Sequence, residues 1–433
     1  MTTPVNARRW VNWGGNQQAV AVDVLTPGTV DEVAAQVKEA SGSGRRIKAV
    51  GSGHSFTDIA RADDQRLLLH RLAGLISIDG TLVTVQAGMP LSRLNAILAE
   101  HGLAMPNLGD IDEQTVAGAI STGTHGTGAK HSTIASCVEA VKLVNGAGEV
   151  VTIGPGDPLL PAVRVSLGAL GILVEVTLRC TEAFTLLADE RPMPLADVLA
   201  GIDEWIGGND HAEFYWHPYT DRAQLKLNNK VPENDRPLSR FRGWLDDEFL
   251  SNTMFGLVCR LGRAVPATVA PLNAINARAL TTRTYTERSD RVFCTPRRVR
   301  FTEMEYEIPR GALPEVLAAL PRIIDALPFR VQFPVEVRFT GPDDVWMSHG
   351  YGRDSAYIAV HQFVGNDYEP YFRGFEAVCQ PLGGRPHWGK LHYRTAGDLR
   401  PAYEKFDDFV AVRDRFDPAR VFANDYLDRV LGS

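Results

Sequence analysis

Hydrophobic and polar positions follow two patterns in the first part of the chain. Between residues 19 and 178, short runs rich in β-branched residues, such as AVAVDVL from Ala19 to Leu25, alternate with stretches in which apolar residues recur every three or four positions. The clearest of these stretches begins with a helix-starting threonine at Thr29 and is followed by the glycines Gly42 and Gly44. The pattern predicts a helix from Thr29 to Ala40 within a mixed α and β domain.

The pattern changes near residue 180, where we place a domain boundary. Residues 226–300 contain more Arg, Asn and Pro and show less clear periodicity. After Gly397, two short helices are predicted, one around Phe406–Phe416 and one over Tyr426–Leu431.

Strong strand patterns return between residues 300 and 395. The runs VQFPVEVRF (331–339) and SAYIAVHQFV (355–364) are rich in β-branched and aromatic residues, and a helix is predicted from Gly311 to Ala326. This succession predicts an antiparallel sheet covered by helices, which suits a substrate-binding domain.

The composition is that of a globular protein with two or three domains. The 433 residues are 44% hydrophobic and 22% charged, and the net charge is −7, with Lys and Arg spread along the chain. A nucleic-acid-binding protein would carry a clustered basic patch, so we expect no nucleic-acid partner.

Cysteine usage and hydropathy indicate the cellular setting. The five cysteines are odd in number and lack CxxC spacing, so we expect neither a disulfide framework nor a metal site. The first twenty residues contain arginines but no apolar run behind them, and the longest apolar stretch, Val163–Leu178, is interrupted by charged residues and glycines. We therefore expect a cytoplasmic protein without a signal peptide and without stable membrane insertion.

Three glycine-rich clusters lie at residues 51–55, 118–128 and 166–172. Glycine lets the backbone approach a phosphate closely, so three clusters together indicate a long ligand that contains a pyrophosphate. A dinucleotide fingerprint of the Rossmann type is excluded because Phe56 stands in place of its third glycine. A nucleotide triphosphatase is disfavoured because Gly128 is followed by Ala-Lys-His where Gly-Lys-Ser/Thr is required.

Five motifs together resemble a known family. GSGHSFTD (51–58), TVAGAISTGTHGTG (115–128), SLGALGI (166–172), EVR (336–338) and RPHWGK (385–390) are similar to the sugar-1,4-lactone oxidases and alditol oxidases, which belong to the vanillyl-alcohol-oxidase group of flavoproteins. The motifs occur in the family's order over nearly the whole chain.

The resemblance implies an α+β protein with two domains. Residues 1–180 would form an FAD-binding domain of the vanillyl-alcohol-oxidase (PCMH) type, to which residues 397–433 return. Residues 181–396 would form a substrate-binding cap domain with an antiparallel sheet and covering helices.

The resemblance also implies that FAD is attached covalently through His54, the histidine of the GHS motif. Without that context, His54 is simply a histidine in a glycine-rich turn. A neutral imidazole in a rigid turn is a suitable nucleophile for the flavin 8α carbon. The other predicted cofactor-binding residues are Gly51, Ser52, Gly53, Ser55, Phe56, Gly109, Asp110, Thr115, Gly118, Ser121, Thr122, Gly123, His125, Gly126, Gly128, Gly168, Gly171, Ile172 and Lys390.

Four residues are predicted to be catalytic. Glu336 and Arg338 are two apart in a strand, so they point to the same face of the sheet, as a substrate-facing pair or as a solvent-exposed ion pair. The resemblance implies that Lys390 lies beside the flavin N1, where a cation stabilises the reduced ring. It also implies that His361 contacts substrate, although a histidine buried in the core would fit the same strand pattern; His387 and Trp388 are interpreted as packing residues.

The resemblance implies oxidation of an aldono-1,4-lactone, such as L-gulono-, L-galactono- or D-arabinono-1,4-lactone, at C2. Hydride would pass to the flavin N5, and O2 would be reduced to H2O2, because Gly109 leaves room for dioxygen where the family can carry alanine. Asp110 replaces a serine of the alditol oxidases, which weakens the case for alditol oxidation at C1. A lactone dehydrogenase that passes electrons to a cytochrome or quinone, and a flavin-binding module without catalysis, are also compatible with the motifs.

Overall fold

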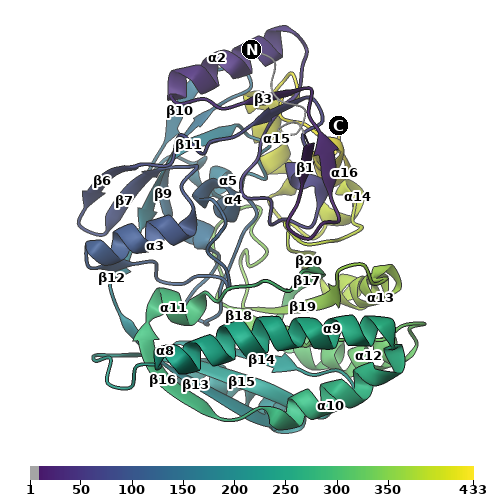
Figure 1. Cartoon of the computed structure of the whole chain (residues 1–433). Coiled ribbons are helices and arrows are strands. Elements are labelled where there is room, and N and C mark those ends of the chain that lie inside the picture. The colour runs from purple at the N-terminus through teal and green to yellow at the C-terminus, as the bar shows by residue number, and fades with distance from the viewer. Residues whose placement is uncertain (1–8) are drawn as a thin grey trace.

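The computed structural model of the chain describes residues 9–433, in two halves stacked one on the other (Figure 1). The upper half contains the N-terminal segments and, beside them, the C-terminal helices; the lower half contains a large sheet with helices packed on its outer face. Residues 1–8 lie outside the described residues; they begin the predicted FAD-binding domain and the N-terminal segment in which no signal peptide is expected.

A small parallel sheet and one helix begin the upper half. Its strand order is β3–β5–β4, and helix α2 (Val30–Gly42) connects β3 to β4. The Thr29 hydroxyl accepts a hydrogen bond from the Glu32 amide, so the predicted helix start is confirmed, and the helix extends two residues past Ala40. The strands are β3 (Asp23–Leu25), β4 (Ile47–Ala49) and β5 (Gln65–Leu67), with a separate hairpin of β1 (Arg9–Val11) and β2 (Gln18–Val20).

A five-stranded antiparallel sheet, in the order β10–β9–β11–β7–β6, forms the rest of the upper half. Strand β11 pairs with both β7 and β9, so it lies at the centre. The bounds are β6 (Leu75–Asp79), β7 (Leu82–Gln86), α3 (Leu91–Glu100), β8 (Leu103–Ala104), α4 (Val116–Ser121), β9 (Val138–Val144), β10 (Val150–Ile153), α5 (Leu160–Arg164), β11 (Ile172–Arg179) and β12 (Thr181–Glu182).

The C-terminal helices pack into the core of this half. Phe409 of α15 (Phe406–Phe416) and Tyr426 of α16 (Asp425–Leu431) are fully buried in the same hydrophobic cluster as residues 83–178, and α14 (Ala396–Leu399) joins them. The bounds of α15 are as predicted, and α16 begins one residue earlier because the Asn424 side chain accepts a hydrogen bond from the Leu427 amide.

The lower half is built on an eight-stranded antiparallel sheet in the order β16–β13–β15–β14–β18–β19–β17–β20. The predicted strand at 355–364 is confirmed as β19, whereas β18 begins at Val335 because Pro334 has no amide hydrogen to pair. The bounds are β13 (Thr185–Pro194), β14 (His211–Trp216), β15 (Arg222–Val231), β16 (Arg283–Arg288), β17 (Phe301–Pro309), β18 (Val335–Thr340), β19 (Ser355–Phe363) and β20 (Arg385–Pro386).

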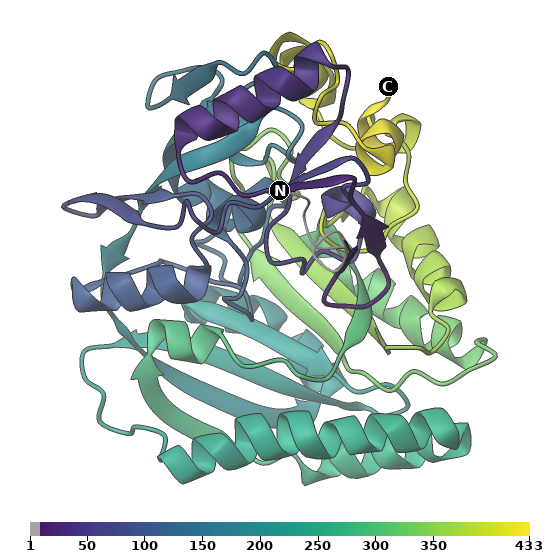
Figure 2. The same cartoon turned by 45° about the horizontal axis from the view of Figure 1, so that its top comes forward.

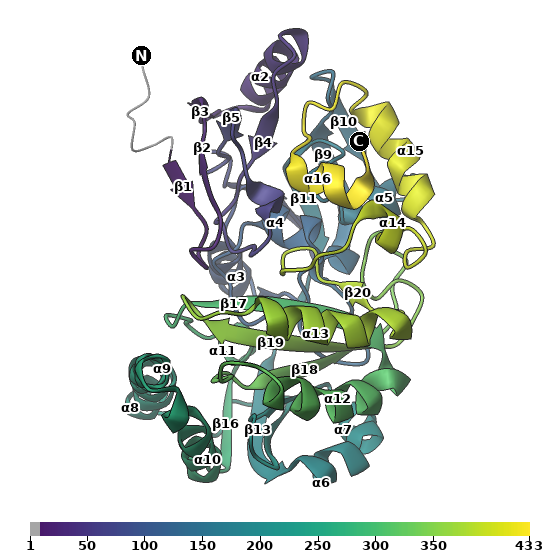
Figure 3. The same ribbon diagram turned by 90° about the vertical axis from the view of Figure 1, so that its right-hand side faces the viewer.

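The two faces of this sheet differ in polarity. One face carries apolar side chains such as Val337 and Met304, which α12 (Leu313–Asp325) and α13 (Glu369–Cys379) cover together with α6 (Leu195–Ala200) and α7 (Ile202–Gly208). The other face carries polar side chains and is turned toward the upper half (Figure 3). The helix predicted at Gly311–Ala326 is confirmed: a 3₁₀ turn at Arg310–Ala312 leads into α12.

Residues 240–279 and 289–293 form further helices, which the sequence pattern did not predict. They are α8 (Arg240–Gly243), the π-helical segment η3 (Trp244–Met254), α9 (Phe255–Ala264), α10 (Val269–Ala279) and α11 (Ser289–Phe293). Among residues 9–433, no helix has both the length and the apolar character needed to cross a bilayer.

Candidate active site

A long cavity of about 420 Å³ lies in the upper half, between the glycine-rich turns. The turn after β4, helix α4 and the turn before β11 supply most of its walls. Twelve of the predicted cofactor-binding residues line it: Gly51, Ser52, Gly53, His54, Ser55, Thr115, Gly118, Ser121, Thr122, Gly168, Gly171 and Ile172.

The walls of this cavity fit a pyrophosphate-containing cofactor. A Cβ at Gly51 would lie 2.7 Å from the Thr115 hydroxyl oxygen, and Gly53 has a φ of +75°, so both positions require glycine to keep the turn against the cavity. At the far end, the Lys48 ammonium donates to the carbonyls of Gly168 and Phe422, and burial lowers the pKa of Lys48 to about 7. Turns without side chains let backbone amides approach the phosphates of a ligand, which suits the pyrophosphate of FAD.

A second cavity of about 110 Å³ adjoins the first and lies against the polar face of the eight-stranded sheet. His54, Ser55, Gln114 and Thr122 line both cavities, so they mark the junction. The predicted residues that line the second cavity are Phe56, Gly109, Asp110, His125, Glu336, Arg338, His361 and Lys390.

Three glycines of the predicted cofactor set line neither of these cavities. A Cβ at Gly123 would lie less than 3.0 Å from the His349 ring. A Cβ at Gly126 or Gly128 would lie equally close to the carbonyl oxygen of Leu108 or Asp210, respectively. Here the missing side chains let the loop pack closely against neighbouring protein.

Glu336 and Arg338 form the centre of a buried charged cluster. Both point to the polar face of β18, and their ion pair is 2.5 Å long. Arg338 also pairs with Asp110 and donates from Nε to Glu213 at 3.1 Å, and Tyr215 donates its hydroxyl proton to Glu336 at 3.0 Å. The pair is therefore not a solvent-exposed ion pair.

The Glu336 carboxyl is shifted toward its protonated form. Burial raises its pKa, and the negative charges of Glu213, Glu305 and Glu303 raise it further, to about 8. A carboxyl with such a pKa becomes a stronger base once it is deprotonated.

Lys390, Glu303 and His361 form a second polar group on the same face. The Lys390 ammonium is paired with Glu303, whose other oxygen lies 3.5 Å from His361 Nε2. Burial alone would raise the pKa of Glu303, but the positive charge of Lys390 and the contact with His361 outweigh it and lower the pKa to about 2. Glu303 therefore stays ionised and fixes the positions of Lys390 and His361.

His54 stands at the junction with its imidazole uncharged. Burial and the nearby Lys390 lower its pKa to about 4, and its ring stacks on Trp13 with centroids 5.7 Å apart. A neutral imidazole has a free lone pair, which nucleophilic attack requires.

His125 lies beside the second cavity and is held by the sheet. Its Nε2 is 3.1 Å from Glu305, and its ring stacks on Tyr357 with centroids 3.7 Å apart. His125, Glu305 and His387 bring their donor atoms within 4.8 Å of one another, a spacing that could hold a metal ion. His387 lines the cavity, whereas Trp388 is fully buried in the core.

The charged residues that sequence reasoning missed come from two strands. Glu303 and Glu305 of β17, and Glu213 of β14, lie on the polar face beside the predicted residues. In the run FTEMEYEIP the glutamates alternate with buried Met304 and Tyr306, a signal that could have placed them on one face.

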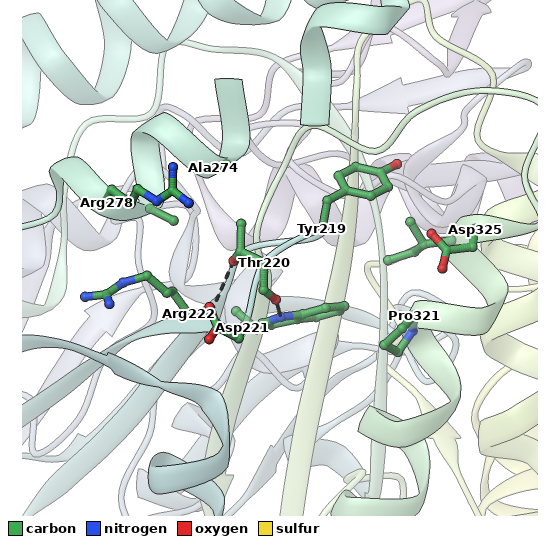
Figure 4. A pocket seen from close by; sticks show the side chains of 11 residues that line it. Tyr219, Thr220, Asp221, Arg222, Ala274, Arg278, Pro321 and Asp325 are labelled. Atoms are coloured by element: carbon green, nitrogen blue, oxygen red, sulfur yellow. Dashed lines mark hydrogen bonds between the residues drawn. The ribbon is translucent and has the colours of Figure 1, made fainter. Parts of the chain in front are cut away.

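A larger cavity of about 500 Å³ lies on the other face of the sheet (Figure 4). Trp216 of β14 points into it, while the adjacent Tyr215 points to the charged cluster, as expected for neighbouring residues of a strand. None of the predicted site residues lines this cavity, so it is not the candidate active site.

The match of residues 23–154 to an FAD-binding domain, together with the fold, makes the chain a flavoprotein of the vanillyl-alcohol-oxidase type. The fold is shared with cholesterol oxidase from B. sterolicum, which superposes with a TM-score of 0.81 at 17% identity, over 98% of this chain and 96% of that one. Residues 23–154 match the family described as FAD binding domain. Residues 176–430 match the family described as D-arabinono-1,4-lactone oxidase, and the chain belongs to this family.

Curated relatives match along almost the whole chain. L-gulono-1,4-lactone dehydrogenase of Mycobacterium tuberculosis is 42% identical over 98% of this chain and 99% of its own length. L-gulonolactone oxidase of Mus musculus is 31% identical over 99% of this chain and 98% of its own length. Alditol oxidase of a Streptomyces species is 30% identical over 97% of this chain and 98% of its own length.

Proposed function

We propose that the chain oxidises an aldono-1,4-lactone, such as L-gulono-, L-galactono- or D-arabinono-1,4-lactone, at C2, which gives a 2-keto lactone. The observation that carries the proposal is the junction of the cavities. The second cavity is lined by the predicted catalytic residues Glu336, Arg338, His361 and Lys390. It meets the first cavity at His54, which lines both. The relatives named as lactone oxidoreductases support the substrate class.

The domain division we propose follows the two halves. Residues 1–180 with 397–433 hold the cofactor, and residues 181–396 cover it as a cap that presents the polar face of the sheet. This division is supported by the hydrophobic core, in which Phe409 and Tyr426 of the C-terminal segment pack with residues between 83 and 178.

FAD would occupy the long cavity, held by the glycine-rich turns and covalently attached at His54. When bound, the flavin accepts the hydride from the substrate carbon. The neutral imidazole of His54 supports the covalent link, because a protonated ring could not attack the flavin. After acid denaturation, flavin fluorescence should stay with the chain, and in His54→Ala it should separate from it; flavin that separates from the wild-type chain would contradict the link.

The chain's own side chains supply acid–base chemistry and charge. Glu336 takes the proton of the substrate hydroxyl, since it lines the second cavity and burial raises the pKa of its carboxyl to about 8. Arg338 and Lys390 hold hydroxyl oxygens and stabilise negative charge that develops during the reaction. His361, fixed by Glu303, contacts the substrate.

We propose dioxygen as the electron acceptor, with H2O2 as the product. Gly109 lines the second cavity without a side chain, which leaves space beside the reacting centre. The relative named as a dehydrogenase supports the second candidate, electron transfer to a cytochrome or quinone. Oxygen uptake with L-gulono-1,4-lactone, compared with reduction of an artificial dye, distinguishes them: dye reduction without peroxide would contradict the oxidase.

A further inference from the structure

A tyrosine hydroxyl lies between two buried carboxyls at the second cavity. Tyr215 and Glu213 are two residues apart on β14, so both side chains point to the polar face, and Tyr215 is the cross-strand partner of Glu336 on β18. The Tyr215 hydroxyl donates to Glu336 Oε1 at 3.0 Å and lies 3.5 Å from Glu213 Oε1. One hydroxyl is therefore within reach of the proposed base and of a second carboxyl.

The second carboxyl stands in a row of alternating charges that crosses the sheet. From β16 to β18, the direct cross-strand neighbours are, in order, Arg283, Glu190, Lys226, Glu213 and Arg338. In Figure 2 the teal strands β13–β15 of this row lie beside the green strands of the sheet. Lys226 Nζ lies 3.7 Å from Glu213 Oε1, and Arg338 Nε donates to Glu213 Oε2 at 3.1 Å. Glu213 is therefore fixed between two cations.

Glu213 also lines a small polar cavity of about 30 Å³. The charged and phenolic side chains that share this third cavity with Glu213 are Asp110, Glu190, Lys226, Tyr285, Arg297 and Arg338. A cavity of this size has room for one or two waters, and its polar wall offers them hydrogen-bond partners. Asp110 and Arg297 line the second cavity as well, and their side chains are 24% and 35% exposed. The third cavity is therefore bounded by groups that reach solvent.

The base at Glu336 needs an outlet of this kind. Its side chain is only 10% exposed, and a lactone bound in the second cavity would cover it further, yet the proton that it accepts must leave before the next turnover. Burial raises the pKa of Glu213, although the positive charges of Lys226 and Arg297 act against it, so this carboxyl is able to take up a proton. Burial and the two carboxylates raise the pKa of Tyr215 well above its usual value, so it remains a hydroxyl.

We propose that Tyr215 relays the proton from Glu336 to Glu213, an inference that rests on the proposed oxidation with Glu336 as its base. The substrate O–H bond breaks and an O–H bond forms on Glu336, while the hydride goes to the flavin. The Tyr215 hydroxyl then turns its hydrogen to Glu213 and passes that proton on as it accepts the one from Glu336. Glu213 releases its proton to water in the third cavity. The hydrogen now on Tyr215 points to Glu336, as it does in the structure.

The test separates the first reduction of the flavin from repeated turnover in Tyr215→Phe, which keeps the ring and removes the hydroxyl. The FAD-loaded protein is used at about pH 9, where Glu336 is ionised. Without oxygen, the rate at which L-gulono-1,4-lactone bleaches the flavin should fall less than about threefold, since one proton can stay on Glu336. Repeated turnover with a dye acceptor should fall at least about tenfold. Glu213→Gln should show the same split, because an amide does not take up the proton.

A second readout distinguishes a relay from a structural role. Imidazole buffer carries protons into cavities that water alone serves slowly, so raising its concentration should restore the turnover of Tyr215→Phe at least about threefold and leave wild type unchanged. A distorted site would not respond to the buffer.

The matched control is Tyr371→Phe. It removes a buried hydroxyl on the apolar side of the same sheet, and among residues 9–433 that hydroxyl has no hydrogen-bond partner. It should match wild type in both rates.

Two results overturn the relay while the proposed oxidation stands. One is wild-type turnover in Tyr215→Phe. The other is an equal loss of first reduction and of turnover without rescue by buffer, because the hydroxyl would then serve only to hold Glu336. If the lactone does not bleach the wild-type flavin at all, the proposed oxidation fails and the relay fails with it.

Discussion

The pH dependence of turnover should report the Glu336 carboxyl. Its rise in pKa from 4.5 to about 8 means that charging Glu336 costs about 5 kcal/mol more than in water, which follows from its burial and from the negative charge of Glu213. Because the base must be deprotonated to accept the hydroxyl proton, activity is lost below this pKa and gained above it.

The expected profile follows from that sign. The kcat/KM for the lactone should rise about tenfold per pH unit up to pH ~8 and then level off, so that about one tenth of the maximum remains at pH 7. Glu336→Gln should lower kcat/KM about a thousandfold and remove the rising limb. Glu213→Gln removes a neighbouring negative charge, so the limb should move to lower pH.

The assay is steady-state turnover with a dye acceptor between pH 5 and pH 10, with flavin content measured at each pH. A wild-type profile that is flat from pH 6 upward would refute the proposed role of Glu336. So would a Glu336→Gln variant that retains the limb, because another group would then be the base.

Three further changes probe the rest of the site. Lys390→Ala should retain bound flavin, read from the visible spectrum, but lower kcat about a hundredfold or more because a cation facing the reacting centre is lost; unchanged kcat would exclude that role. Gly51→Ala places a methyl 2.7 Å from the Thr115 hydroxyl, which should cost about 1–3 kcal/mol and lower the flavin content of the purified protein; full flavin content would show that the turn can shift. Gly109→Ala puts a methyl 3.1 Å from the His125 carbonyl, and oxygen consumption should fall about tenfold, or about 1.4 kcal/mol, with dye reduction retained; an equal loss of both would indicate a folding defect.

Local signals in the sequence predicted the elements that depend on local physics. Helix α2 begins after Thr29 because the threonine side chain caps it. Helix α15 has the predicted bounds because its apolar residues lie on one face and pack into one hydrophobic core. Strand β18 starts later than the hydrophobic run suggests, because Pro334 has no amide hydrogen to pair and the Val331 amide donates to the Tyr219 hydroxyl instead of to a neighbouring strand.

The helices between residues 240 and 279 escaped prediction for a physical reason. Segment η3 is π-helical, and its buried residue is the polar Asn252, so its pattern does not follow the 3.6-residue period of an α-helix. In α9 the buried side consists of Gly256, Cys259 and Gly262, two of which are glycines that disfavour a helix by local propensity.

The candidate site was predicted only in part. Motifs identified His54, Glu336, Arg338 and Lys390 because each stands in a recognisable run. Glu303 became visible only when the sheet brought β17 next to β19, where it meets His361, since cross-strand neighbours are far apart in sequence.

The most direct test of the proposed reaction is reduction of the bound flavin by substrate in the absence of oxygen. The FAD-loaded protein is mixed with L-gulono-, L-galactono- or D-arabinono-1,4-lactone, or with xylitol or sorbitol, and the loss of visible flavin absorbance is followed in a stopped-flow instrument. At least one lactone should bleach the flavin faster than either alditol at equal concentration. Faster bleaching by an alditol, or no bleaching by any lactone, would contradict the proposed function.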